Sequence, residues 1–199
     1  MIKAFRYAIV LTGGIATGKS TVLNFFTKWN FSFIDADRVA HQILQQENKN
    51  IAKLFGLEYV IDNKVNRKAL GKLIFANPKE RKKLENFIHP LIYREIEHQS
   101  MRLDILKRPY IIDIPLFFES NRYTIERSIV VYTPKQKQLE RLIKRNGFSK
   151  REAEQRIEAQ MDIELKREKA TYLIDNSGDL KTLQEECVKV KEKILSDFK

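Results

Sequence analysis

The sequence has little cysteine and no long hydrophobic run. Its 199 residues include one cysteine, Cys187, so no disulfide can form within the chain, and this usage is typical of a reducing cytoplasm. Cys187 lies in a helix-patterned stretch, where we interpret it as a small core residue rather than a nucleophile. No apolar stretch is long enough to cross a bilayer, and the N-terminal segment lacks the layout of a signal peptide. We therefore expect a cytoplasmic protein with no membrane partner.

Acidic residues are too few to balance the basic ones. The chain has 37 Lys and Arg against 26 Asp and Glu, which gives a net charge of +11. Positive charge of this size favours anionic partners such as nucleotides, nucleic acid or acidic membranes. A lysine-rich solvated surface explains the charge equally well, so charge alone does not decide between these two interpretations. Hydrophobic residues make up 43% of the chain, as in ordinary globular proteins, and the length suffices for one domain with small insertions.

Five short apolar runs predict buried strands. They are rich in Ile, Val and aromatic residues and do not alternate with polar ones, as is typical of parallel strands buried on both faces. Helical patterns separate the runs, and an amphipathic pattern over 180–198 predicts a closing helix. This alternation predicts an α/β fold with a parallel sheet covered on both faces. The runs are residues 7–11, 31–34, 110–114, 129–132 and 172–174.

A polar residue stands at or near the end of each apolar run. Open α/β sheets bind ligands outside the carboxyl ends of their strands. We therefore expect these polar side chains to gather at one edge of the sheet, beside a ligand. They are Thr12, Asp35, Asp113, Thr133 and Asp175.

Two helical insertions are expected between the strands. In residues 66–107 apolar side chains recur at helical spacing, and we expect Pro78 to begin a helix there and Pro90 to kink or break one. The second insertion is a helical hairpin, whose first helix is expected over 134–145 and should stop at Gly147. The sequence SKRE that follows has capping-box spacing for the second helix. The hairpin is basic and carries Arg141, Lys144, Arg145, Lys150, Arg151 and Arg156.

A glycine-rich turn follows the first predicted strand and precedes a helical pattern. The stretch GGIATGKS, Gly13 to Ser20, matches the phosphate-binding pattern G-x-x-x-x-G-K-S/T. Glycines let backbone N–H groups wrap a phosphate, and a helix that begins at about Lys19 adds its positive dipole end. We expect Lys19 to reach the β- and γ-phosphates and the hydroxyl of Ser20 to ligate Mg²⁺. Since a strand and a helix flank it, the turn predicts a nucleoside triphosphate site rather than a chance run of glycines.

Two aspartates follow the second predicted strand. Asp37 lies just past the strand end, where a kinase benefits from a carboxylate that orients and deprotonates an acceptor hydroxyl. A carboxylate near Mg²⁺ can also hold metal-bound water. The alternative is a helix cap, because aspartate is a common N-cap and a helical pattern follows. The residues alone leave the two interpretations of Asp37 evenly balanced.

At these residues the sequence resembles the dephospho-coenzyme A kinase family. The glycine-rich motif is generic, but three further stretches are together specific: FIDADRVAHQIL, the His-Pro pair in LENFIHPLI, and YIIDIPLFFES. QLERLIKRNGFSKREAEQRIEAQM resembles the family's lid, and IDNSGDL resembles its turn before the last helix. The resemblance covers nearly the whole chain.

The resemblance implies an α/β fold, the three-layer P-loop kinase fold with a five-stranded parallel sheet, a helical substrate-binding insertion and a helical lid. It implies transfer of the γ-phosphoryl group of ATP to the ribose 3′-hydroxyl of dephospho-coenzyme A, with Mg²⁺, as the final step of coenzyme A synthesis. The partners would be these two small molecules, without nucleic acid or membrane, in a monomer or weak homo-oligomer. The implied domains are a core of 1–61, 104–140 and 168–199, a coenzyme A-binding insertion of 62–103 and a lid of 141–167.

The resemblance also assigns roles by position. Asp37 is expected to be the catalytic base, with Lys19 and Arg145 stabilising the transferred group. The residues that match the ATP site are Gly13, Gly14, Ala16, Thr17, Gly18, Lys19, Ser20, Thr21, Arg141, Arg145, Asn176 and Gly178, with Ser20 as metal ligand. Those that match the acceptor site are Asp35, Asp37, His89, Pro90, Asp113, Leu116 and Glu119. Taken singly, each polar or charged residue also has an ordinary structural interpretation, such as a satisfied histidine, a solvated cation or a turn residue.

Three positions depart from the family pattern. Ala16 stands where glycine is more usual, which costs little if the φ angle there is negative, so we expect ATP binding to survive. His41 stands in place of a common arginine, which removes a fixed charge because histidine is largely neutral at pH 7. Asn146 stands in place of a common lid aspartate.

Two other functions compete with the one that the family implies. Another small-molecule P-loop kinase would share the fold and the glycine-rich turn, and only the DAD, His-Pro and DIPLFFE stretches argue against it. A nucleic-acid-binding ATPase would need a basic stripe away from that turn, preferably with stacking aromatic residues. Here the basic residues concentrate partly in the predicted lid, where ATP explains them.

Overall fold

The structure is a computed structural model that describes residues 4–120 and 122–199. The chain divides into two compact units. The larger unit comprises the chain up to Ile34 together with Ser100–Lys199, and the smaller unit is Asp35–Gln99. The smaller unit begins well before the predicted insertion of 62–103, whose binding of coenzyme A stays a prediction. In the described ranges, no helix is both long and apolar enough to cross a membrane.

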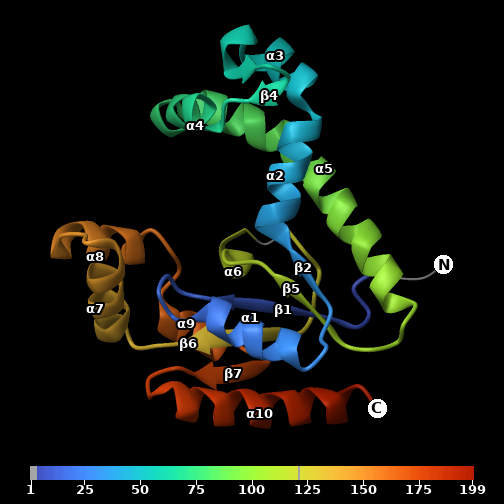
Figure 1. The fold of residues 1–199 in the computed structure, drawn as a ribbon, viewed down its shortest axis with the longest axis vertical. Coiled ribbons are helices and arrows are strands. Elements are labelled where there is room, and N and C mark those ends of the chain that lie inside the picture. Colours follow the sequence, from blue (N-terminus) through green and yellow to red (C-terminus); the bar gives the residue numbers. More distant parts are fainter. Residues whose placement is uncertain (1–3, 121) are drawn as a thin grey trace. The chain divides into compact units, whose positions relative to one another are not determined.

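A five-stranded sheet organises the larger unit (Figure 1). β1 pairs in parallel with β5 and with β6, and β6 pairs in parallel with β7. Because the chain moves from one side of β1 to the other between β5 and β6, the carboxyl end of β1 is a topological switch point, where such sheets bind ligands. The five predicted strands are confirmed, with ends shifted by at most two residues. The order is β2 (Phe33–Asp35), β5 (Tyr110–Asp113), β1 (Ala8–Gly13), β6 (Ser128–Tyr132) and β7 (Tyr172–Asp175).

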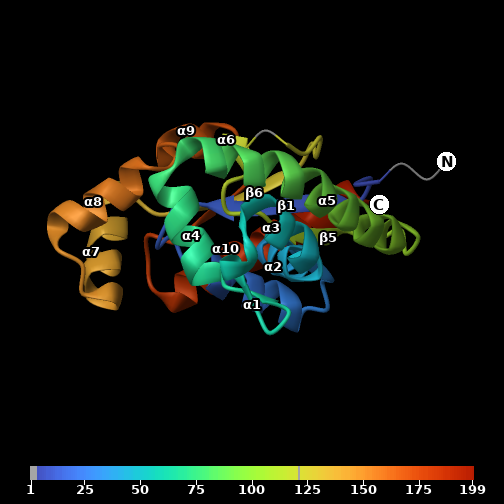
Figure 2. The same ribbon diagram turned by 90° about the horizontal axis from the view of Figure 1, so that it is seen from above.

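Helices cover both faces of this sheet, which gives three layers. Alternate strand residues face a cluster with α1 (Lys19–Lys28) and α10 (Leu180–Asp197), and the intervening residues face α9 (Ile163–Glu168). Figure 2 shows α1 on one side of the strands and α9 with α6 (Phe117–Ser120) on the other. The predicted closing helix is confirmed as α10.

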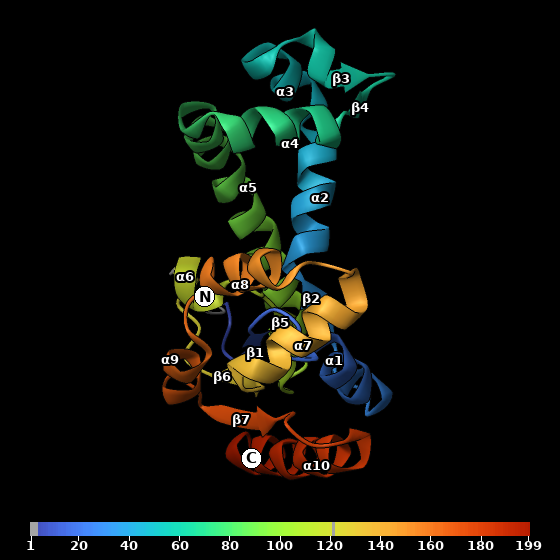
Figure 3. The same ribbon diagram turned by 90° about the vertical axis from the view of Figure 1, so that its left-hand side faces the viewer.

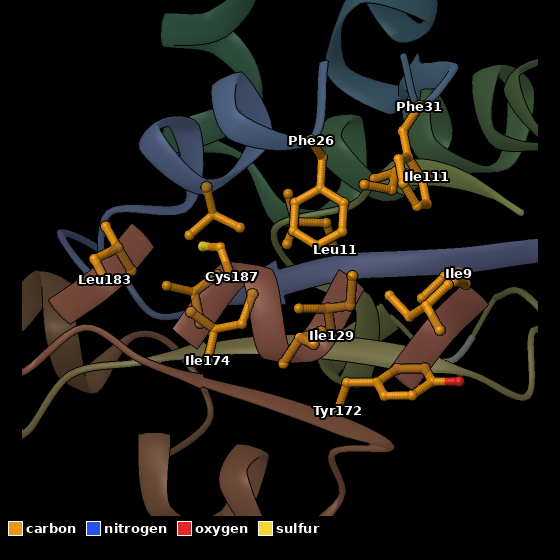
Figure 4. Close-up of a cluster of buried hydrophobic side chains, with 14 residues drawn as sticks. Ile9, Leu11, Phe26, Phe31, Ile111, Ile129, Tyr172, Ile174, Leu183 and Cys187 are labelled. Atoms are coloured by element: carbon orange, nitrogen blue, oxygen red, sulfur yellow. The ribbon is translucent and has the colours of Figure 1, made fainter. Parts of the chain in front are cut away.

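The main core cluster lies between the sheet and helices α1 and α10. Figure 4 shows Phe26 of α1 and Cys187 of α10 directed toward strand residues such as Leu11 and Ile129. Cys187 is fully buried, and burial raises the pKa of its thiol to about 12. A thiol that stays protonated has little nucleophilic character, so its interpretation as a core residue is confirmed.

The basic hairpin forms as predicted, with α7 (Lys135–Asn146) and α8 (Lys150–Glu158) packed side by side (Figure 3). Gly147 ends α7 with a φ of 68° and donates its N–H to Ile143 O at 2.8 Å. Ser149 and Glu152 form the predicted capping box at the start of α8.

The smaller unit contains two helices, a short hairpin and a further pair of helices. The hairpin turns at Asp62 and Asn63, whose φ angles of 50° and 59° are those of a type I′ turn. The side chain of Gln45 braces it, since it accepts the N–H of Val65 at 3.1 Å and donates to Asn63 O at 2.9 Å. The elements are α2 (Ala36–Gln46), α3 (Asn48–Phe55), a 3₁₀ turn (Leu57–Tyr59), β3 (Val60–Ile61), β4 (Lys64–Val65), α4 (Arg67–Ala76) and α5 (Pro78–Asp104), the last of which runs on into the larger unit.

Helix α5 begins at Pro78, as predicted, and Asn77 caps it by accepting the N–H of Lys79 at 3.0 Å. The predicted helical stretch is thus two helices divided at Asn77. The sequence predicts that Pro90 kinks or breaks a helix. It lies inside α5, which continues through it, so the predicted break is wrong, whereas the kink stays a prediction. A proline removes only one intrahelical hydrogen bond, and helical pairing on both sides of Pro90 is enough to carry the helix across.

Candidate active site

The phosphate-binding turn, Gly13–Ser20, joins the central strand β1 to helix α1. β1 ends at Gly13 and α1 begins at Lys19, so the predicted helix start is confirmed. Within the described residues, the backbone N–H groups of Gly18, Lys19 and Ser20 donate to no protein acceptor. Such groups at the positive end of a helix dipole are well suited to bind phosphate oxygens.

Gly18 is required both by its backbone conformation and by its neighbour. Its φ of 91° lies in the left-handed region, which favours glycine. A Cβ atom at this position would lie 2.2 Å from Nδ2 of Asn176. That amide donates to Thr17 O at 2.7 Å, so any side chain at position 18 would displace a contact that holds the turn.

Ala16 has a φ of 61°, so the condition under which alanine would cost little here, a negative φ, is not met. An L-residue in this region costs roughly 1–2 kcal/mol, which explains why glycine is the more usual residue. Ala16 and Ile15 pack against the hairpin cluster formed by Leu139, Leu142 and Ala153. This apolar contact offsets part of the backbone cost.

The ends of β6 and β7 brace the turn from one side. Oγ1 of Thr133, just after β6, lies 3.3 Å from Thr17 O, and the side-chain amide of Asn176, just after β7, donates to the same carbonyl. Arg141 joins these supports, because its guanidinium donates to Asn176 O at 2.8 Å and to Thr133 Oγ1 at 3.2 Å. Thr133, one of the strand-end polar residues expected to gather at one edge of the sheet, therefore lies at the phosphate-binding turn.

Lys19 and Asp113 meet on the other side of the turn. Nζ of Lys19 donates to Oδ1 of Asp113 at the carboxyl end of β5, and both side chains are largely buried, with 20% and 12% of their surface exposed. A partly buried ion pair needs such direct contact, because it has given up much of its hydration. The lysine expected to reach the phosphates is thus held at the switch point by a carboxylate.

The structure distinguishes the two aspartates after β2. Asp35 is the N-cap of α2, and its carboxylate accepts the N–H of Arg38 at 2.9 Å. Asp37 lies in the first helical turn and is exposed. The cap interpretation of Asp37 is therefore wrong, since Asp35 fills that role. Its interpretation as a catalytic base stays a prediction.

Comparison with known proteins identifies the family. Residues 7–182 match the family described as "Dephospho-CoA kinase". The chain belongs to the dephospho-CoA kinase family. Relatives in this family include the dephospho-CoA kinases of Sulfurimonas denitrificans, 54% identical over 98% of both chains, and of Wolinella succinogenes, 40% identical over 99% of both. The resemblance that the motifs indicated is confirmed.

Solved structures agree with this dephospho-CoA kinase assignment. A dephospho-CoA kinase from Campylobacter jejuni matches with a TM-score of 0.72 and 35% identity, over 94% of this chain and 97% of its own. A Thermus thermophilus protein matches with a TM-score of 0.78 and 31% identity, over 96% and 97%. The predicted fold, an α/β P-loop kinase with a five-stranded parallel sheet, is confirmed.

The remaining residues that match dephospho-CoA kinase motifs come from both units. Arg145 is exposed on α7, and its Nε donates to Asn146 Oδ1 at 2.9 Å. Leu116 is 45% exposed, and Glu119 on α6 bonds within the larger unit. His89 and Pro90 lie on α5 in the smaller unit. The ATP and acceptor roles of these residues stay predictions.

Three polar side chains around the turn were given no role by the sequence analysis. Gln138 of α7 is 1% exposed and donates to Thr133 O at 2.8 Å. Gln160 accepts the N–H of Ile15 at 2.8 Å. Lys166 of α9 is fully buried and reaches the turn as well. Gln138 and Lys166 lie in charged helical stretches and Gln160 in the connection between α8 and α9, so only the fold reveals these contacts.

Proposed function

We propose that this chain transfers the γ-phosphoryl group of ATP to the ribose 3′-hydroxyl of dephospho-coenzyme A and so yields coenzyme A and ADP. The observation that carries the proposal is membership of the dephospho-CoA kinase family over nearly the whole chain, with a relative of that name at 54% identity. The geometry of the phosphate-binding turn supports the donor half of the reaction. The product would be that of the last step of coenzyme A synthesis.

ATP places its triphosphate at the turn in this proposal. The N–H groups of Gly18, Lys19 and Ser20 donate to phosphate oxygens, and Nζ of Lys19 moves from Asp113 to the transferring group. Phosphoryl transfer depends on positioning and on stabilising charge, which suits fixed N–H donors and cations. Arg141 and Arg145 add positive charge, since guanidinium groups fit phosphate oxygens, and the turn from Asn176 to Gly178 contacts the adenine.

Mg²⁺ fits the oxygen donors at this edge of the sheet. The hydroxyl of Ser20 is exposed in the first turn of α1, and the carboxylate of Asp113 adjoins Lys19. Mg²⁺ takes few protein oxygens and keeps water and substrate phosphate ligands, so such a small set suffices. Ser20 would hold the ion, which, when bound, neutralises charge on the β- and γ-phosphates.

Asp37 acts on the acceptor in this proposal. Its carboxylate accepts the proton of the 3′-hydroxyl. The side chain of Asp37 is exposed, and because Asp35 caps α2, Asp37 is not needed for capping. The lid excludes water, which would otherwise hydrolyse ATP. The residues that line the acceptor site are Asp35, Asp37, His89, Pro90, Asp113, Leu116 and Glu119.

The partners proposed are ATP and dephospho-coenzyme A alone, in the cytoplasm, with the chain as a monomer or weak homo-oligomer. The net charge of +11 is the feature that favours the rival, a nucleic-acid-binding ATPase. A gel shift with a steep salt dependence would support that rival, and the absence of any shift at low salt would exclude it.

An ADP-release assay with a panel of alcohols tests the acceptor. ATP and Mg²⁺ are supplied alone, with dephospho-coenzyme A, or with nucleosides, nucleotides and shikimate. We expect ADP release above background with dephospho-coenzyme A only. If ADP is released equally without any acceptor, or only with another alcohol, the assignment of dephospho-coenzyme A as acceptor is wrong, whereas the assignment of the ATP site is not affected.

A further inference from the structure

Lys166 is a fully buried lysine that none of the assigned roles uses. It lies on α9, whose Ile163 packs against β6, and none of its surface is exposed. Removing an ammonium group from water costs several kcal/mol unless charged and polar partners replace the lost hydration. A buried lysine is therefore stable only where charged and polar partners surround its ammonium group.

Those partners are a carboxylate and the phosphate-binding turn. Nζ of Lys166 lies 2.7 Å from Oε1 of Glu119 and donates to the carbonyl oxygen of Gly13 at 3.1 Å. The same Oε1 accepts the N–H of Met161 at 3.0 Å. The ion pair thus joins three segments: the end of β1, helix α6, and the segment that leaves the α7–α8 hairpin.

The contact to Gly13 fixes the first peptide group of the turn. Because a peptide unit is planar, a fixed carbonyl of Gly13 also fixes the direction of the N–H of Gly14. The next N–H, that of Ile15, donates to Gln160 at 2.8 Å. One segment, residues 160–166, therefore holds two consecutive peptide groups at the entry of the turn.

We propose that Lys166 is a positioning residue for ATP: paired with Glu119, it holds the Gly13 carbonyl and couples the phosphate-binding turn to the segment that leaves the α7–α8 hairpin. A turn fixed before ATP arrives loses less conformational entropy on binding, so fixing it increases affinity. The pairing gives Glu119 a positioning role in addition to the binding role that the family motif predicts. The effect on turnover rests on the proposed function, whereas the effect on ATP affinity rests on the turn alone.

The test compares Lys166→Met with Lys166→Arg and with Lys169→Met, an exposed lysine at the end of the same helix. The dissociation constant for ATP is measured by calorimetry, and KM for each substrate, kcat and Tm are measured in parallel. We expect Lys166→Met to weaken ATP binding by about tenfold, because it removes a buried charged hydrogen bond. The loss of ATP affinity should exceed the change in the KM for dephospho-coenzyme A, because Lys166 contacts the phosphate-binding turn directly and the acceptor site only through Glu119. Lys166→Arg should recover most of the ATP affinity, and Lys169→Met should match the wild type.

Glu119→Gln keeps the inference testable if Lys166→Met fails to fold. This variant leaves the Lys166 charge without its carboxylate, so we expect it to weaken ATP binding. In the double variant with Lys166→Met, the loss of ATP-binding free energy should be smaller than the sum of the losses in the two single variants. Wild-type ATP affinity in Lys166→Met would overturn the inference; if only Glu119→Gln folds, wild-type ATP affinity in that variant would do so. Equal losses of affinity for ATP and for dephospho-coenzyme A, in proportion to a fall in Tm, would also overturn it. If the wild type binds ATP but does not phosphorylate dephospho-coenzyme A, the proposed function fails while the affinity comparison still decides the role of Lys166.

Discussion

Lys19, at the first position of α1, forms an ion pair with Asp113, at the last position of β5. The two strands that lead to these residues, β1 and β5, are hydrogen-bonded neighbours, with Leu11 in register with Asp113. The sheet therefore sets the pair, and ATP must compete with the Asp113 carboxylate for Lys19.

Replacing Asp113 separates ATP binding from turnover. Asp113→Asn removes the competing charge, so we expect the dissociation constant for ATP to stay within about threefold or to fall. We expect kcat to fall at least about tenfold, because the variant also removes a carboxylate that we propose to lie on the acceptor side of the site. Asp197→Asn, at the C-terminal end of α10, is the control and should keep wild-type kcat. An Asp113→Asn variant with full turnover would contradict the proposed place of this carboxylate.

Ala16→Gly should relieve the backbone of the phosphate-binding turn. The φ of 61° favours glycine, but glycine also loses more entropy on folding and gives up the packing of the methyl group. We therefore expect a small gain, about 0–1 kcal/mol, in the free energy of unfolding measured with urea. Ala52→Gly, within helix α3, is the control and should lose about 1 kcal/mol. A loss of similar size in Ala16→Gly would show that packing outweighs backbone strain at this position.

Removal of the Asp35 side chain should lower stability, whereas removal of the Asp37 charge should lower turnover. Asp35→Ala removes the cap of α2, so we expect it to lower the free energy of unfolding by about 1 kcal/mol. Asp37→Asn should change stability by less than about 0.5 kcal/mol, because the side chain is exposed, and should retain ATP binding while it loses most of kcat. Urea titrations and steady-state kinetics on both variants provide the comparison. Unchanged turnover in Asp37→Asn would remove the base assignment.

The buried thiol makes stability depend on alkaline pH. Burial raises the pKa of Cys187 to about 12 from an ordinary value of 9.0, so the unfolded chain ionises this thiol first. Its contribution to stability is therefore complete below pH 9 and is lost as the pH rises from 9 toward 12. Urea titrations at pH values of about 8 and 10.5 should show a smaller loss of stability in Cys187→Ala than in the wild type. Equal losses would mean that Cys187 ionises alike in both states.

Local patterns were sufficient to predict the strands, the turn and the hairpin caps. Gly147 and the Ser149–Glu152 pair specify their caps through backbone preferences and short-range hydrogen bonds, which the sequence displays directly. The positive φ of Ala16 is not one that alanine favours, and its signal in the sequence was only that glycine is more usual at this position in the family. The continuity of α5 through Pro90 was not predicted, because a proline forbids one hydrogen bond but not the helix around it.

The side chains that support the phosphate-binding turn were the hardest part of the site to predict from the sequence. Lys166 and Gln160 lie about 150 residues from the turn that they contact, at sequence separations of 153 and 145. Their sequence context is a run of charged residues, which is typical of solvated helices. Only the order of β1 and β6, with α9 against β6, brings this segment to the start of the turn.

Phosphoryl transfer to the 3′-hydroxyl of dephospho-coenzyme A is decided by the identity of the product. The chain is incubated with ATP labelled in its γ-phosphoryl group, Mg²⁺ and dephospho-coenzyme A, and the product is examined by mass and by phosphorus NMR. We expect one ADP for each labelled coenzyme A, with the label on the ribose 3′ position. Label found in free phosphate, or on any other position of the acceptor, would contradict it.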